Sequence, residues 1–365
     1  MQGEFIDATD RRWRAFLEAT PHDVYHLPEY GTLSAQGTDS IPIAYLAEDG
    51  ETRLLIPLLE TRVPAELSGG TRWSDLASPY GYASPLLVGD HARFSSLLRG
   101  FAEACAERGS VAAFLRSHPL IPPDWSPAPS WNTERTAAHL VSRGETVFID
   151  LTKSAASLRG ELRTDHRRGI DRLLKRGYSS SVDDWSLYGK FLVLYWRTME
   201  RVQASSSYFF PEAYFRAIPE LLRGRVHLIS ILDPEGEVVA GGLFFKSGDI
   251  IQYHLGGSDP AQMKLSPSKL SIHAATQWGQ AIGARSLHLG GGLGAREDPL
   301  FWFKSGFSPL RRSYSTLGVL ADCKAYAELL VRSGGDPMSS FFPAYRAPRP
   351  TRDADHGQVA AAAQV

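Results

Sequence analysis

The hydrophobic and polar positions of the first half of the chain predict strands interleaved with helices. Residues 91–108 carry apolar side chains three and four positions apart, which is the spacing of an amphipathic helix. Two strands are expected at 41–46 and 53–59, because alternating apolar runs flank a short acidic connection there. Further strands are expected at 111–115 and 146–151. The pattern predicts a first domain that ends near residue 151.

The second half predicts a similar order with longer helices. Strands are expected at 226–232, 238–246, 250–255, 286–289 and 312–320, and helices at 156–176, 186–203, 211–222, 268–282 and 323–331. The turn sequence Asp233-Pro-Glu-Gly236 joins the first two of these strands. We therefore expect a mixed α/β fold with domains at 1–151 and 152–335. The stretch 347–365, with proline, arginine and an alanine run, is expected to be a disordered tail.

Composition narrows the class of protein. The chain has 365 residues, of which 43% are hydrophobic and 22% are charged, as in soluble globular proteins. The net charge of −1 means that any contact with nucleic acid needs a local basic patch. Cys105 and Cys323 lack metal-type spacing, so no metal site is expected and a reducing cytoplasm is the natural compartment. No run approaches the roughly 20 apolar residues of a membrane span, and the charged start of the chain does not resemble a secretion signal.

A strand, a glycine run and a capped helix follow one another late in the chain. The run Gly290-Gly291-Gly292-Leu293-Gly294 comes directly after the strand expected at 286–289. Asp298 is a natural N-cap, Pro299 suits the first helical position, and Gly306 fits just past the end. These signals predict a helix of about two turns whose end presents the pair Phe303-Lys304.

These motifs, together with Ser74–Tyr82 and the basic stretch 163–176, resemble the Fem-type aminoacyltransferases of the GNAT superfamily. The resemblance covers roughly 25–331 and is strongest over 255–307. It implies two tandem GNAT-like domains, each a mixed, largely antiparallel sheet flanked by helices. It also implies an N-aminoacyltransferase that moves an amino acid from aminoacyl-tRNA to an amine of a peptidoglycan precursor or a peptide-like metabolite. Two features depart from the family: there is no coiled-coil arm, and 27–34 lacks the acceptor-binding lysine.

The resemblance also assigns candidate roles at the glycine run and the short helix. From spacing alone, Lys304 is a cation that complements the end of a helix dipole. The resemblance implies that Lys304 stabilises the acyl-transfer intermediate or the tRNA end, and that Phe303 shapes the site, because acyl transfer passes through an oxyanion. Gly291 and Gly292 are explained by a tight turn, or by close approach of a substrate backbone or tRNA phosphate.

Further substrate-binding candidates lie elsewhere in the chain. Tyr80 and Tyr82 match a Pro-Tyr-Gly segment of the family and are expected at the acceptor, an amine-bearing peptide or nucleotide-linked molecule. Arg163 and Arg167 share a helix face, and either could be the arginine that the resemblance places at the acceptor cleft. The basic stretch is equally well read as a solvated face. His254, without a paired carboxylate nearby in the sequence, is expected to be a satisfied histidine and not a general base.

The acyl donor is the remaining question. GNAT enzymes that use acetyl-CoA carry a Gln/Arg-x-x-Gly-x-Gly/Ala loop that cradles the pyrophosphate, and 256–268 lacks it. Ser268 and Lys269 nevertheless begin a helix where a phosphate or carboxylate can be met. No resident cofactor is expected, with aminoacyl-tRNA as co-substrate. The alternative is an acyl-CoA-dependent GNAT enzyme acting on a small amine, and a third possibility is a non-catalytic scaffold.

Overall fold

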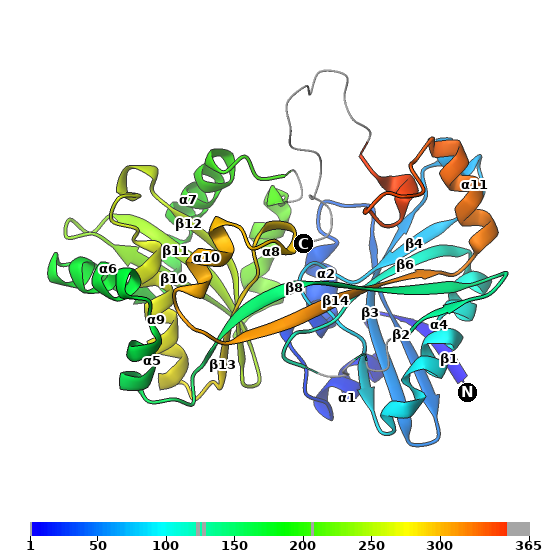
Figure 1. Ribbon diagram of the computed structural model, residues 1–365, viewed down its shortest axis with the longest axis horizontal. Coiled ribbons are helices and arrows are strands. Elements are labelled where there is room, and N and C mark those ends of the chain that lie inside the picture. Colours follow the sequence, from blue (N-terminus) through cyan, green and yellow to red (C-terminus); the bar gives the residue numbers. More distant parts are fainter. Residues whose placement is uncertain (1, 122–124, 126–128, 206–207, 349–365) are drawn as a thin grey trace. The chain divides into compact units, whose positions relative to one another are not determined.

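The computed structural model describes residues 2–121, 125, 129–205 and 208–348, so most of the expected tail at 347–365 lies outside the described residues. The chain forms two compact units (Figure 1). The first contains the residues up to 143, the segment 211–217 and the residues from 313 onward. The second contains 144–210 and 218–312. This division differs from the expected contiguous domains, because the last strand and helix of the chain belong to the first unit.

The sheet of the first unit has the order β1-β2-β3-β4-β6-β14. Its strands are β1 (Gln2–Asp7), β2 (Ile41–Asp49), β3 (Thr52–Arg62), β4 (Ser74–Ala77), β6 (Ser110–Arg116) and β14 (Arg311–Leu320). The expected hairpin is confirmed as β2 and β3, and the neighbouring strands of this order pair antiparallel except β4 and β6, which are parallel. Two short strands lie beside this order. Strand β5 (Leu86–Val88) pairs with β3, and β7 (Trp131–Asn132) pairs with β8 (Ala137–Asp150).

The helix expected at 91–108 provides the crossover between the two parallel strands of the first unit. It is α4 (Phe94–Arg108), and it buries Leu97 and Phe101 against Leu54 and Ile56 of β3. The other helices of this unit are α1 (Arg11–Glu18), α2 (Pro28–Ser34), α3 (Ala65–Ser68) and α11 (Cys323–Ser333). Because β4 and β6 are parallel, both strands end at the same edge of the sheet.

The second unit repeats this scheme around a sheet of order β8-β13-β12-β11-β10-β9. The strands are β9 (Ser179–Val182), β10 (Val226–Leu232), β11 (Val238–Ser247), β12 (Ile250–Ser258) and β13 (Ser286–Gly290), with β8 entering this unit at Gly144. Strands β12 and β13 are parallel and are joined through α9 (Ser268–Ala281), whereas the other neighbours are antiparallel. The predicted mixed α/β class with largely antiparallel sheets is confirmed.

Two helices of the second unit cover opposite faces of its sheet. Along β11, Ala240 joins the core that includes Ile272 of α9, while a side chain at the next residue, Gly241, would meet Phe191 of α7 (Tyr188–Arg201). Successive residues of a strand face opposite sides, so α7 and α9 lie on different faces. The remaining helices are α5 (Ala155–Glu161), α6 (Thr164–Lys175), α8 (Glu212–Leu221), which begins in the first unit, and α10 (Pro299–Ser305).

The prediction of a single helix at 156–176 is wrong, because the chain forms two helices there. Leu162, with φ −62° and ψ 131°, and Arg163, with φ −57° and ψ 142°, both have extended backbones. Helix α5 therefore ends at Glu161 and α6 begins at Thr164. The amphipathic pattern continues through the break, which explains why periodicity alone predicts one helix. Because of this break, the backbone N–H and the side chain of Arg163 can contact the end of helix α10 (Pro299–Ser305).

Candidate active site

Helix α10 forms as its capping signals predict. The Asp298 carboxylate accepts hydrogen bonds from the backbone N–H of Phe301 and of Leu293, each at 2.9 Å. Pro299 is the first helical residue and Gly306 is the C-cap. Asp298 therefore fixes both the start of the helix and the preceding glycine-rich turn. The inward residue of the first turn is Phe301, which is buried, whereas Leu300 is 37% exposed.

Lys304 is a buried cation at the end of α10. Its side chain is only 9% exposed, and its Nζ donates to the backbone carbonyl oxygen of Gly291 at 2.6 Å. No carboxylate of the described residues forms an ion pair with it, and Asp298 acts on it only through a weaker charge interaction. Burial lowers the pKa of Lys304 from 10.5 to about 8. An ammonium group has three N–H donors, so two remain after the bond to Gly291.

The glycine run gives Lys304 its partner. Gly290 and Gly294 have positive φ values of 76° and 60°, as expected for a tight turn. Gly292 is required for a different reason, since a Cβ there would lie 2.1 Å from the carbonyl oxygen of Arg296 and 2.3 Å from Asp298 Oδ1. The turn therefore closes only around glycine, and this closure presents the Gly291 carbonyl to the lysine.

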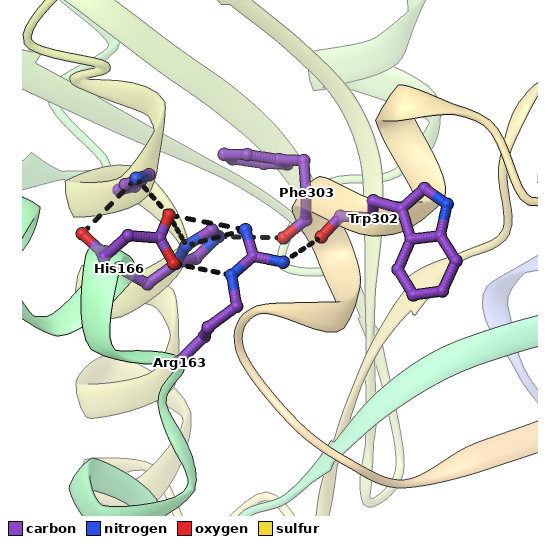
Figure 2. A network of polar contacts seen from close by, with 6 residues as sticks. Arg163, His166, Trp302 and Phe303 are labelled. Atoms are coloured by element: carbon purple, nitrogen blue, oxygen red, sulfur yellow. Dashed lines mark hydrogen bonds and ion pairs between the residues drawn. The ribbon is translucent and has the colours of Figure 1, made fainter.

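A polar network at the start of α6 holds the last turn of α10 (Figure 2). Arg163 Nη1 donates to the carbonyl oxygen of Trp302 at 3.0 Å, and His166 Nε2 lies 2.9 Å from that of Phe303. The backbone N–H of Arg163 also donates to Gly306 at 2.9 Å. The last carbonyls of a helix have no partners within it, so these bonds satisfy groups that need an outside donor. The network fixes the backbone on both sides of Lys304.

His166 is the functional candidate that the sequence did not reveal. Because a carbonyl oxygen only accepts hydrogen bonds, Nε2 carries a proton, and burial holds the pKa of His166 below its ordinary value. Its ring packs 4.6 Å from that of Phe307 and 5.5 Å from that of Phe303. A Cβ on Gly306 would approach this ring to 2.4 Å. Gly306 has an ordinary φ of −72°, so this position does not need glycine for a left-handed cap. It needs glycine because a side chain there would collide with the His166 ring.

The two arginines proposed for the acceptor have different surroundings. Arg163 forms an ion pair with Asp165 at 2.5 Å, in addition to its bond to α10. Arg167 is half-buried and forms no ion pair with any described residue. The exposed cations of the same region, likewise without ion pairs in the described part of the chain, are Arg168, Arg172, Lys175 and Arg176. Helix α6 thus presents an uncompensated basic surface.

The remaining candidates of the second unit are largely occupied by structural contacts. Lys269 Nζ forms an ion pair at 3.1 Å with Asp165, the carboxylate that also pairs with Arg163. Ser268 is the first residue of α9, and Pro267, not Ser268, holds the N-cap position. His254 stacks on Phe245 with ring centroids 4.1 Å apart, and burial lowers its pKa to about 3, so it is neutral. The described residues contain no cluster of metal-ligating side chains.

Tyr80 and Tyr82 lie in the first unit, just after β4. Both are half-buried, and the Tyr82 ring meets that of Tyr314 edge-on at 5.4 Å. Burial raises the pKa of Tyr80 to about 12. Both tyrosines interact electrostatically with Arg116, a buried arginine that the sequence did not single out. Its place at the end of the apolar run 111–115 predicts burial but gives no sign of the tyrosines around it.

Comparison with known proteins defines the class. Residues 160–297 match the sequence family described as an acetyltransferase (GNAT) domain. A crystal structure of FemX is 15% identical and matches 91% of this chain and 100% of its own with a TM-score of 0.65. L-PGS from Bacillus licheniformis is 16% identical over 90% of this chain and 97% of its own, with a TM-score of 0.56. No curated protein matches the sequence at a significant level.

These matches confirm the expected class, an acyltransferase with a GNAT domain and the fold seen in FemX. The similarity to FemX extends along nearly the whole chain and so includes both units. At this level of identity it establishes the fold alone. None of the helices in the described ranges combines the length and apolarity of a membrane span.

Proposed function

We propose that this chain is an N-aminoacyltransferase that takes an amino acid from aminoacyl-tRNA and joins it to an amine. The acceptor is a peptidoglycan precursor or a peptide-like metabolite. The observation that carries the proposal is Lys304, a buried ammonium group without a carboxylate partner among the described residues, which donates to Gly291 of the segment 160–297 that matches a GNAT domain. Similarity to the folds of FemX and L-PGS supports the same reading.

In the proposed reaction, the acceptor amine attacks the ester carbonyl directly. A bond forms between the amine nitrogen and the carbonyl carbon, and the carbonyl electrons move onto oxygen. Lys304 donates one of its two remaining N–H groups to that oxyanion, and a fixed cation at this point lowers the barrier. The bond to the ribose oxygen then breaks, that oxygen takes up a proton, and the amine releases one to a substrate carboxylate or to water.

Other candidate residues act on position and binding. His166 and Arg163 hold the turn that carries Lys304, so they are positioning residues. Phe303 packs beside His166 and Phe307 and shapes the end of the helix. The exposed arginines of α6 provide a surface for tRNA phosphates. Because such contacts release counterions, binding should weaken steeply as salt rises.

Filter binding of the purified protein to a mixed aminoacyl-tRNA pool tests the donor, with calorimetry of acetyl-CoA run beside it. Salt-sensitive retention of charged tRNA, with no heat from acetyl-CoA, is the expected result. A double variant of the protein, with Arg168 and Arg172 replaced by glutamine, should retain less of the same tRNA pool and show a shallower salt dependence of binding. Retention that is equal for the wild type and this double variant would remove α6 from the tRNA site.

The acyl-CoA-dependent alternative rests on the family match over 160–297. Its phosphate site would be the segment 256–268 and the start of α9. There, Asp259 caps a short 3-10 helix at Pro260–Gln262, and Lys269 is paired with Asp165. An anionic cap and a neutralised lysine are poor surroundings for a pyrophosphate. Tight binding of acetyl-CoA, with turnover in an RNA-free assay, would nevertheless establish this alternative.

A further inference from the structure

The first unit holds a second buried cation, Arg116, that the proposed chemistry does not use. It is the last residue of β6 and is 7% exposed. Its Nη1 lies 3.4 Å from the carbonyl oxygen of Ser78 and 3.3 Å from that of Pro79, which are long hydrogen bonds. Its Nε has no hydrogen-bond partner, and no carboxylate among the described residues forms an ion pair with it.

The surroundings of Arg116 are phenols and one aromatic face. Tyr30, Tyr80, Tyr82 and Tyr314 are its electrostatic neighbours, and the guanidinium lies over the ring of Phe114 at 5.2 Å. Burial raises the pKa of Tyr30, Tyr80 and Tyr314, so these phenols stay neutral. Neutral hydroxyl groups can donate hydrogen bonds but do not cancel the charge of the guanidinium.

A buried charge without a partner is strongly unfavourable. A guanidinium has five N–H donors in a planar fork that matches the two oxygens of a carboxylate. One guanidinium balances one negative charge, and the neighbouring phenols supply neutral donors. This charge balance favours a monoanionic carboxylate over a phosphate dianion, which would need a second cation in direct contact.

The position of Arg116 in the sheet supports a ligand site. Strands β4 and β6 are parallel, and both end here, at Ala77 and Arg116. In sheets with helical crossovers, ligands bind outside the carboxyl ends of such strands. Lys304 contacts Gly291, one residue past the carboxyl end of β13, which is parallel to β12. Each unit therefore places one buried cation at the carboxyl end of its parallel strand pair.

We propose that Arg116 and the surrounding tyrosines form a carboxylate-binding subsite. The subsite binds a molecule that carries a free carboxylate, as an amino acid or a peptide does. Arg116 binds that carboxylate through its fork, and the phenols of Tyr30 and Tyr80 border it.

The test is a titration of the full chain with L-alanyl-L-alanine, its C-terminal amide and inorganic phosphate, without tRNA or any acyl donor. The wild type should bind the dipeptide at least tenfold more tightly than its amide. Arg116→Met should remove that preference, and Arg116→Lys, which keeps the charge but loses the fork, should retain part of it. Arg53→Met is the control, because Arg53 lies in the same unit and stacks on Phe16 at 5.5 Å.

Equal affinity of the wild type and Arg116→Met for the dipeptide, including no binding by either, would overturn the subsite. Preference for phosphate over the dipeptide would overturn the choice of carboxylate. Thermal unfolding without ligand separates binding from structure: removal of an unpaired buried cation should leave the melting temperature of Arg116→Met unchanged or raised. A melting temperature lowered in both Arg116 variants would assign Arg116 to holding Ser78 and Pro79. Failure of tRNA binding would leave these results unaffected, so the two proposals fail separately.

Discussion

The protonation state of Lys304 gives the sharpest test of the proposed chemistry. Burial lowers the pKa of Lys304 from 10.5 to about 8, a difference of about 2.5 units or about 3.4 kcal/mol against the charged form. About nine-tenths of the lysine is charged one pH unit below this pKa, and about one-tenth is charged one unit above it. If the ammonium form stabilises the oxyanion, kcat should be constant near neutrality and fall about tenfold per pH unit above about pH 8.

The assay is single-turnover transfer from preformed aminoacyl-tRNA between about pH 6 and about pH 10, corrected for spontaneous ester hydrolysis. Lys304→Met, which keeps the length of the side chain without its charge, should lower kcat by about 100- to 1,000-fold. Lys304→Arg stays charged throughout, so any activity it retains should lack the decline near pH 8. A rise in rate through pH 8 that is present in the wild type and absent from Lys304→Arg would show that the neutral amine of Lys304 acts as a base and would refute the proposed role.

The same pKa predicts a change in stability that does not depend on function. Between about pH 8 and 10.5, the unfolded chain keeps its proton on Lys304 while the folded protein loses it. The unfolded state then binds more protons, so the free energy of unfolding should rise with pH through this window as far as Lys304 contributes. Denaturant unfolding at several pH values should show this rise in the wild type and its loss in Lys304→Met. Equal slopes in both proteins would mean that the lysine is not buried as described.

Substitutions at three further positions test the supports of α10. His166→Leu should lower kcat and cost about 0.5–1.5 kcal/mol of stability, because the Phe303 carbonyl then keeps only the backbone N–H of Gly306 as a donor. His166→Gln, which can restore an N–H donor, should recover part of kcat, and equal kcat for both variants would separate His166 from catalysis. Gly306→Ala should lower the melting temperature, since its Cβ would approach the His166 ring to 2.4 Å, and an unchanged value would show that the ring moves freely. Asp298→Ala should cost about 0.5–2 kcal/mol in denaturant unfolding through the lost N-cap, with Asp90→Ala, which removes the cap of a surface 3-10 turn, as control.

Local signals predicted much of the fold because they act over a few residues. The caps of α10, the hairpin of β2 and β3 and the amphipathic face of α4 all formed where the sequence indicated. The break between α5 and α6 was missed, because it depends on contacts of Arg163 with α10, more than 100 residues away. The assignment of β14 to the first unit was missed for the same reason, since strand pairing between distant segments leaves no periodic signal in either segment.

The candidate site shows the same limit. Lys304 and the glycine run could be singled out as candidates because a turn, a cap and a cation follow one another in sequence. His166 and Arg116 were not found, because each is defined by what the fold brings to it: a helix end in one case, a ring of tyrosines in the other. A lone histidine or arginine in an amphipathic or buried segment has no local feature that separates it from a structural residue.

The pairing of β14 with β6 has a consequence for biosynthesis. Thr316 of β14 lies opposite Arg116 of β6, about 200 residues earlier in the chain, and loop closure over such a distance slows folding. On the ribosome, the second unit has all its strands once residue 312 has emerged, whereas the first still lacks one. Tyr314 also arrives with that last strand. The proposed carboxylate subsite is therefore completed last, so a nascent chain can hold an assembled Lys304 before it can bind such a carboxylate.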